Sequence, residues 1–318
     1  MMALSRREFS KAVGATIGSL AAAGLPKNML SQTPRKMRMA LSCGAIGVKA
    51  GQLEAIEYAS RHGFEAVEPY AGYLAGLSDA QASELAARLK SQGLTWAVAG
   101  LPVDFRKDDA KFASDMAGLP KAAAALRRVG ADRVGTWIMP SHPTLPYVQN
   151  FRLHVSRLRE AAKVLKDHGA RLGLEYVGPR TLLVSQRYPF IHTKAEAADL
   201  ISEVGTGNVG YVLDTFHWWT SGDTKEDILA LKATDVVGVD LNDAAAGVSR
   251  DEQQDGKREL PCATGVIDAA TFLNALASIG YDGPARVEPF NQAVRAMPPE
   301  QALAATAAAL KKAMALIG

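Results

Sequence analysis

The sequence predicts an α/β protein with a single (β/α)8 barrel, also called a TIM barrel, over residues 34–318. Three observations predict it: a unit that recurs about every 36 residues, a short apolar run in each unit, and a count of eight such runs. A doubly wound open sheet is the alternative, but it usually has fewer strands and needs a phosphate-binding glycine-rich turn after its first strand. The segment "SCGAIGVKAG" is glycine-rich but matches neither common phosphate-binding motif.

The eight expected strands are short runs rich in Val, Leu and Ile, as buried parallel strands require. The first is "MRMALSCG" at residues 37–44, ahead of the first repeat. Six others follow a glycine, as in "RHGFEAVEPY" and "DHGARLGLEYVG". The remaining one, in "LKATDVVGVDLND", lacks the glycine. It lies within the interval of 75 residues between Gly205 and Gly280, which is about twice the usual spacing. The repeat glycines are Gly63, Gly93, Gly130, Gly169, Gly205 and Gly280.

A helix is expected before each of these glycines, because glycine adopts the left-handed conformation that ends a helix at low cost. Apolar residues at helical spacing support this expectation. In one such helix they are Val155, Leu158, Ala162 and Leu165. The patterns Ser78-x-x-Gln81 and Thr193-x-x-Glu196 predict capping boxes at the start of two further helices.

Residues 1–33 are expected to be a twin-arginine export signal and a linker rather than part of the barrel. The segment "SRREFSK" holds an arginine pair, a phenylalanine two places on and a following lysine. A weakly apolar run, rich in Gly and Ala, follows from Val13 to Leu25. The alternative is an ordinary amphipathic helix. The signal predicts export to the periplasm or the extracellular space, with no stable membrane insertion afterwards.

The composition excludes several classes of protein. The chain has 36 basic and 33 acidic residues, and four of the basic but one of the acidic residues lie in residues 1–30. The remainder is therefore balanced in charge, which argues against a nucleic-acid partner. No apolar stretch reaches the roughly 18 residues of a membrane-spanning helix. Cys43 and Cys262 allow at most one disulfide, and neither lies in a C-x-x-C zinc pattern.

A carboxylate ends each of the expected strands five to eight, and these strand ends meet on the face of the barrel where chemistry gathers. A salt bridge or a helix cap could explain any one of them. Four carboxylates on adjacent strands repel one another, and a divalent cation offsets that repulsion. All-oxygen ligands favour a hard ion, Mn²⁺ first, with Mg²⁺ and Ca²⁺ as alternatives. The four are Glu175, Asp214, Asp240 and Glu288.

Other strand ends offer further candidates. Glu68 and His142 are candidate substrate-binding residues, although Glu68 could instead only turn the chain and His142 could be structural or exposed. Trp137 lies at the end of the fourth strand. The tryptophans of "FHWW", Trp218 and Trp219, could supply a stacking wall for a sugar or could pack against a helix.

These features resemble the xylose-isomerase-like sugar isomerase and epimerase barrels over about residues 37–317. The segments that carry the resemblance are "LGLEYVG", "VLDTFHWW", "VDLNDA", "RELPCATGVID" and "GYDGPARVEPF". The resemblance implies that Glu175, Asp214, Asp240 and Glu288 bind one metal ion. It also implies that Glu175 and Glu288 act as the catalytic acid/base pair and that His217 contacts the substrate.

The chain departs from the family pattern at two places. The strand-seven histidine of the family is Asp240 here, which exchanges a neutral ligand for an anionic one and favours a harder ion. The P-G-E-G loop of the family is "PCATG" at residues 261–265, so one carboxylate is absent. Arg258 keeps a basic position of the family and either binds substrate or is a solvated loop arginine. The six histidines form no cluster in the sequence, which argues against the related three-zinc endonucleases.

The predicted reaction is isomerisation or epimerisation of a sugar or keto-sugar by proton transfer through an enediolate. One alternative is a 3-keto-glycoside lyase or hydrolase, in which the carbanion beside the ketone expels the substituent at C1. The other alternative is a non-catalytic sugar-binding barrel whose site changed with Asp240. The expected partner is a small carbohydrate, and the oligomeric state stays open, with a homodimer among the options.

Overall fold

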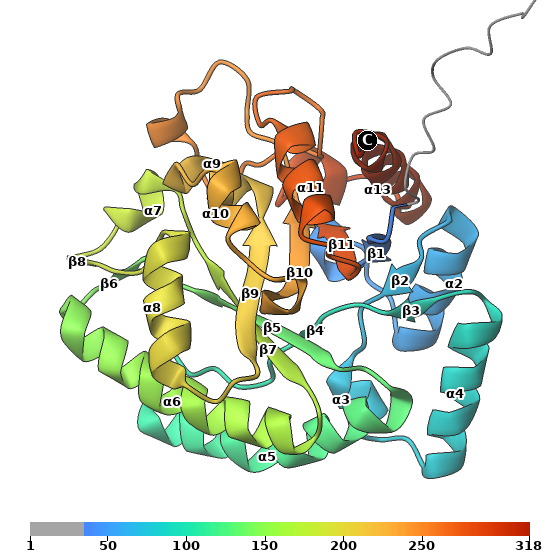
Figure 1. Ribbon diagram of the computed structural model, residues 1–318. Coiled ribbons are helices and arrows are strands. Elements are labelled where there is room, and N and C mark those ends of the chain that lie inside the picture. Colours follow the sequence, from blue (N-terminus) through green and yellow to red (C-terminus); the bar gives the residue numbers. More distant parts are fainter. Residues whose placement is uncertain (1–34) are drawn as a thin grey trace, which may run out of the picture. The chain divides into compact units, whose positions relative to one another are not determined.

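The computed structural model describes residues 35–318, and the export signal predicted at residues 1–33 lies outside them. The strands of the main sheet form the parallel ring of a (β/α)8 barrel, which confirms the predicted fold (Figure 1). The third barrel strand is split into β3, which pairs with β2, and β4, which pairs with β5. The order is β3-β2-β1-β11-β10-β9-β7-β5-β4. The strands are β1 (Arg38–Leu41), β2 (Ala66–Val67), β3 (Thr95–Trp96), β4 (Ala99–Gly100), β5 (Arg133–Ile138), β7 (Arg171–Tyr176), β9 (Val209–Asp214), β10 (Val236–Leu241) and β11 (Pro284–Val287).

The helices alternate with these strands along the chain. Both predicted capping boxes are present, at Ser78 before α4 and at Thr193 before α8. Gly63, Gly130 and Gly205 end helices with positive φ, as the repeat predicted. The helices are α2 (Gln52–His62), α3 (Ala71–Leu74), α4 (Asp79–Ser91), α5 (Asp109–Val129), α6 (Tyr147–Asp167), α7 (Arg180–Leu183), α8 (Lys194–Val204), α9 (Thr215–Ser221), α10 (Lys225–Leu229), α11 (Ala269–Ser278), α12 (Gln292–Arg295) and α13 (Pro299–Met314).

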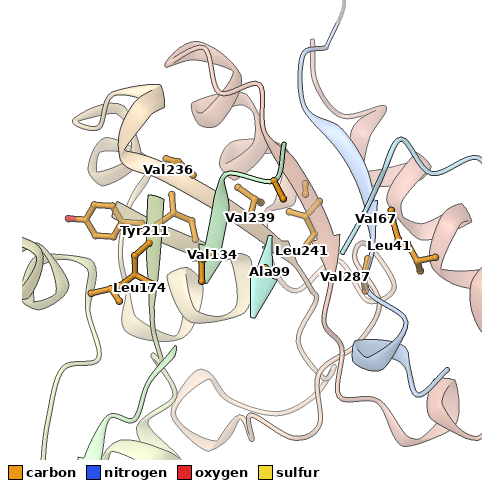
Figure 2. Close-up of a cluster of buried hydrophobic side chains, with 14 of the residues drawn as sticks. Leu41, Val67, Ala99, Val134, Leu174, Tyr211, Val236, Val239, Leu241 and Val287 are labelled. Atoms are coloured by element: carbon orange, nitrogen blue, oxygen red, sulfur yellow. The ribbon is translucent and has the colours of Figure 1, made fainter. Parts of the chain in front are cut away.

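The main hydrophobic core contains strand residues and helix residues together. Figure 2 shows strand side chains of this core, among them Leu41, Leu174 and Val239, and all three are buried. Successive residues of a strand point to opposite sides of the sheet. The residues that alternate with this core therefore line the inside of the barrel, and several of them, such as Ala40 and Gly238, are small. The barrel interior consequently keeps a cavity of about 160 Å³.

Two further features lie outside the barrel sheet. A short antiparallel pair, β6 (Ser141–His142) with β8 (Tyr188–Pro189), joins the loops that follow β5 and β7. Both cysteines are free thiols, Cys43 buried and Cys262 partly buried. Among residues 35–318, no helix combines the length and the apolar character needed to cross a membrane.

Candidate metal centre

Four carboxylates from adjacent strands lie together at the C-terminal end of the barrel. Each residue contributes one carboxylate oxygen to a group of four oxygens that all lie within 4.8 Å of one another. The strand register explains this, because Asp214 is paired with Asp240 across β9 and β10, and Asp240 is paired with Arg286 across β10 and β11. The members are the four predicted residues, Glu175, Asp214, Asp240 and Glu288.

Asp214 lies at the point where a strand becomes a helix. It is the last residue of β9 and the N-cap of α9, and its Oδ1 accepts a hydrogen bond from the Phe216 backbone N–H. The other oxygen, Oδ2, accepts from Asn242 Nδ2 at 2.7 Å. The Asn242 side-chain oxygen accepts from the Glu288 backbone N–H at 3.1 Å. The Asn242 amide therefore contacts both Asp214 and Glu288.

Arg258 is buried in the cluster, with 1% of its surface exposed. The interpretation of Arg258 as a solvated loop arginine is therefore wrong. Its Nη1 donates to Asp214 Oδ2 at 2.8 Å and its Nη2 donates to Asp255 Oδ1 at 2.6 Å. The ring of Phe290 lies 4.7 Å from the guanidinium carbon, so charge and aromatic contacts both fix this side chain.

A second arginine, Arg286, binds Asp240, one of the four predicted metal ligands. Arg286 Nε donates to Asp240 Oδ1 at 2.6 Å, and Nη2 donates to Oδ2 at 3.0 Å. The same Nη2 lies 3.3 Å from Glu288 Oε1. Both oxygens of Asp240 are thus engaged by a forked guanidinium. The sequence predictions did not include Arg286, although it lies in β11 only two residues before Glu288, and residues two apart in an extended chain point to the same side.

Glu175 is the least satisfied member of the cluster. Its side chain is 9% exposed, and its Oε1 is buried without a hydrogen-bond partner. Burial, together with the neighbouring carboxylates, raises the pKa of Glu175 well above its ordinary value. Burial also raises the pKa of Glu288, and it raises that of Asp214 to about 7 although Arg258 acts in the opposite direction. The cluster therefore lacks positive charge despite its two arginines.

His217 lies beside this cluster on α9 and is 1% exposed. Its Nε2 is 3.1 Å from Arg258 Nη2 and 3.6 Å from Glu175 Oε1. The Gly178 backbone N–H also points at Nδ1, at 3.3 Å, so both ring nitrogens face donors although a neutral ring can accept at only one of them. Burial and the nearby Arg258 lower the pKa of His217 well below its ordinary value, which agrees with a neutral ring. A Cβ on Gly178 would lie 2.4 Å from the His217 carbonyl oxygen, so α9 can approach the β7 strand end only because residue 178 is glycine.

The remaining candidates lie around the cluster rather than in it. Glu68 accepts a hydrogen bond from Ser42 at the ends of β2 and β1. His142 belongs to β6, in a neighbouring cavity. Trp218 packs edge-on against Phe272 at 5.3 Å and is 7% exposed, so it is part of the core and not a sugar-stacking wall.

Asp243, three residues after Asp240, holds the loop that departs from the family pattern. Its Oδ2 accepts from the backbone N–H groups of Thr264 and Gly265, and its Oδ1 accepts from that of Ile267. The loop therefore lacks the carboxylate of the family pattern, but its backbone N–H groups are held by the buried carboxylate of Asp243.

A cavity of about 270 Å³ gives access to the cluster. Acidic, basic and aromatic groups share its wall, which suits a small polar ligand with some apolar surface. Glu175 and Glu288 both line it, and both also line the 160 Å³ cavity inside the barrel. The polar and aromatic lining residues are Trp137, Glu175, His217, Asp255, Arg258, Glu288 and Phe290.

The donor set fits a divalent cation. The buried, unpartnered oxygen of Glu175 needs a positive partner, and oxygens of three more carboxylates lie within 4.8 Å. Two guanidinium groups cannot balance four carboxylates, so a formal negative excess remains for a cation to offset. An all-carboxylate set favours a hard ion with oxygen ligands.

Comparison with known proteins agrees with this fold. Residues 56–313 match the family model described as "Xylose isomerase-like TIM barrel". D-psicose 3-epimerase of Ruminiclostridium cellulolyticum is 27% identical over 246 residues, which is 74% of this chain and 77% of that protein.

Two solved structures share the architecture. A xylose isomerase domain protein from Alicyclobacillus acidocaldarius is 29% identical, with a TM-score of 0.76 over 88% of this chain and 99% of that chain. The IOLI protein, whose structure is described as having a bound zinc atom, is 19% identical. Its TM-score is 0.72, over 88% of this chain and 98% of that chain.

Proposed function

The chain belongs to the xylose isomerase-like TIM barrel family, and from this premise we propose that it is a metal-dependent isomerase or epimerase of a sugar or keto-sugar. The observation that carries the proposal is the set of four buried carboxylates whose oxygens lie within 4.8 Å of one another. The similarity to a D-psicose 3-epimerase supports the same class of reaction.

Glu175, Asp214, Asp240 and Glu288 are the residues that would hold the ion. We propose Mn²⁺, with Mg²⁺ and Ca²⁺ as alternatives, since all four ligands are oxygens. When bound, such an ion supplies polarisation of a substrate carbonyl and acidifies the adjacent C–H group. The bound zinc atom described for the IOLI structure supports a divalent ion in a related fold.

In this proposal, the side chains of Glu175 and Glu288 transfer the protons. Glu175, whose Oε1 has no hydrogen-bond partner, takes the proton from the carbon next to the carbonyl and leaves an enediolate. Glu288 in its acid form returns a proton, either to the opposite face of the same carbon or to the neighbouring carbon. Arg258 donates to Asp214, Asp255 and the Glu288 carbonyl oxygen and contacts His217, so it positions these groups around the substrate.

A second function shares the first step. In a 3-keto-glycoside, proton removal at C2 would let the C1–O bond break as a C1=C2 double bond forms, and Glu288 would protonate the departing oxygen. The observation that favours it is a further cavity beside the carboxylate cluster, large enough for another sugar unit.

We expect the purified protein to hold about one divalent metal ion per chain and to exchange substrate protons with solvent. The test measures metal content by mass spectrometry and, in D₂O, deuterium incorporation into a panel of ketoses and keto-sugars. Exchange at the carbon beside the carbonyl supports proton abstraction whether or not a product forms. Metal-loaded protein that exchanges no sugar in the panel would instead indicate a binding barrel.

We also propose export through the twin-arginine pathway to the periplasm or the extracellular space, on the basis of the segment "SRREFSK". Changing both Arg6 and Arg7 to lysine should abolish accumulation outside the cytoplasm, because the pathway requires the arginine pair and not merely positive charge. Cell fractionation measures this, with Lys36→Arg as a conservative exchange outside the signal. Unchanged accumulation of the double variant would contradict the proposed signal.

A further inference from the structure

We propose that a second cavity beside the carboxylate cluster binds a neutral sugar unit, so that the substrate is a disaccharide or another glycoside. The inference rests on the proposed function and specifies its substrate class. The cavity measures about 430 Å³ and lies between β5, the β6 segment and helix α6. Trp137 and Met139 line both this cavity and the 270 Å³ cavity at the carboxylates, so the two adjoin there.

The wall of the second cavity contains polar atoms without partners. Asn150 Oδ1, His154 Nε2 and Gln186 Oε1 are buried and make no hydrogen bond among the residues that the structure describes. Asn150 and His154 are only 2% and 4% exposed. These atoms have almost no accessible surface of their own, so a ligand in the cavity would reach them only after the side chains rotate. Buried polar groups are nearly always paired, so three unpaired atoms on residues of one wall indicate a polar ligand.

The two histidines of the wall have defined roles. His154 Nδ1 lies 2.9 Å from the Asn150 carbonyl oxygen, which only accepts, so Nδ1 carries the proton and Nε2 is an acceptor. Burial lowers the pKa of His154 to about 4, so the ring stays neutral. His142 is the reverse case: its Nδ1 accepts from the Thr144 and Leu145 N–H groups, which makes its Nε2 a donor. A ligand with several hydroxyl groups can satisfy both.

Trp137 adds an apolar surface at the junction of the cavities. Its side chain is 43% exposed although it lies at the end of a barrel strand. Arg106 lies 4.1 Å from the ring centroid and donates to the Trp137 carbonyl oxygen at 2.7 Å, so the indole is held in place. An exposed, immobilised indole beside hydrogen-bonding groups suits the C–H face of a sugar ring.

The donor and acceptor pattern favours a neutral sugar over a phosphorylated one. Arg106 and Lys107 line the cavity and could attract an anion, but Arg106 is already paired with Asp104 at 3.2 Å. A phosphate dianion offers no donor for His154 Nε2, whereas a hydroxyl group does. The unpaired acceptor therefore selects for hydroxyl donors.

The test replaces His154 by phenylalanine, which removes the acceptor but keeps the aromatic contacts to Phe105 and Phe190. Calorimetry measures the binding of cellobiose, maltose and sucrose, with glucose and glucose 6-phosphate for comparison. At least one disaccharide should bind the parent about tenfold more tightly than glucose, and His154→Phe should lose about that factor while glucose binding stays unchanged. The control is His168→Phe, the same exchange at the residue that caps the C-terminus of α6.

Three results would overturn the inference: equal affinity for glucose and every disaccharide, tightest binding of glucose 6-phosphate, or an equal loss in His168→Phe. If His154→Phe does not fold, Gln186→Leu removes another unpaired acceptor from a partly exposed position. Deuterium exchange into a monosaccharide tests the proposed function separately, because it depends on Glu175 and Glu288 and not on this cavity.

Discussion

Replacing Glu175 or Glu288 by glutamine is expected to lower turnover by ~10²–10⁴-fold, the usual contribution of a positioned acid or base. An amide has nearly the shape of the carboxyl group but cannot accept a proton at neutral pH. Stopped assays with the substrate found in the sugar panel measure the loss. Because burial disfavours the charged form of both glutamates, neither variant should unfold at a lower temperature than the parent.

The two variants should differ in their partial reactions. The glutamate that faces the abstracted proton controls deuterium exchange into the substrate, and we assign this role to Glu175. The Glu288→Gln variant should therefore still exchange while it forms no product. Metal content must be measured in the same samples, since loss of the ion would mimic loss of a base.

The control for both variants is Glu203→Gln, an exchange at a side chain that is 64% exposed on α8. It should leave turnover unchanged. Normal turnover in metal-loaded Glu175→Gln and Glu288→Gln would exclude the proposed proton transfers while leaving the fold assignment intact.

The carboxylate cluster could be predicted because the repeat fixes where each barrel strand ends. Once a strand is known to end near Glu175 or Asp214, the common C-terminal face brings the two together without any knowledge of side-chain packing. The pairing of Asp214 with Asp240 across neighbouring strands follows from the same geometry. Periodic patterns of this kind can be recognised in the sequence without a structure.

Arg286 could have been predicted by the same reasoning, but it lies in a mostly apolar segment, "PARVEPF". Counting back by two from Glu288 places it inside the barrel, where a charged side chain requires a partner. The second cavity could not be predicted from residue spacing. Asn150, His154 and Gln186 come from a helix and a loop whose approach depends on tertiary packing, and no spacing in the sequence brings them to one wall.

Breaking the Asp240–Arg286 ion pair from either side is expected to lower the free energy of unfolding by about 3–5 kcal/mol, whereas replacing both partners should cost little. Asp240 is 1% exposed and Arg286 is 22% exposed. Arg286→Met leaves a buried anion without its guanidinium, and Asp240→Leu leaves the guanidinium with only Glu288. The double variant is apolar at both positions, so its free energy of unfolding should lie close to that of the parent.

Urea unfolding in the presence of a chelator measures the four proteins of this cycle. A matched cycle on Glu57 and Arg88 provides the control, because that pair has a similar distance of 2.7 Å but side chains that are 60% and 37% exposed. Its coupling energy should stay below about 1 kcal/mol. Equal coupling in the two cycles would contradict the role that we assign to burial of the Asp240–Arg286 pair.

The same variants show whether Asp240 binds the ion. Arg286 engages both oxygens of Asp240, so a cation must compete with a guanidinium for this ligand. Arg286→Met should therefore bind Mn²⁺ about tenfold more tightly than the parent, and Asp240→Leu about tenfold more weakly, the scale expected for groups that support a metal site. Titration with Mn²⁺, followed by its paramagnetic resonance signal, measures both affinities without an activity assay. If both variants bind Mn²⁺ as the parent does, the other three carboxylates hold the ion and Asp240 serves only as the partner of Arg286.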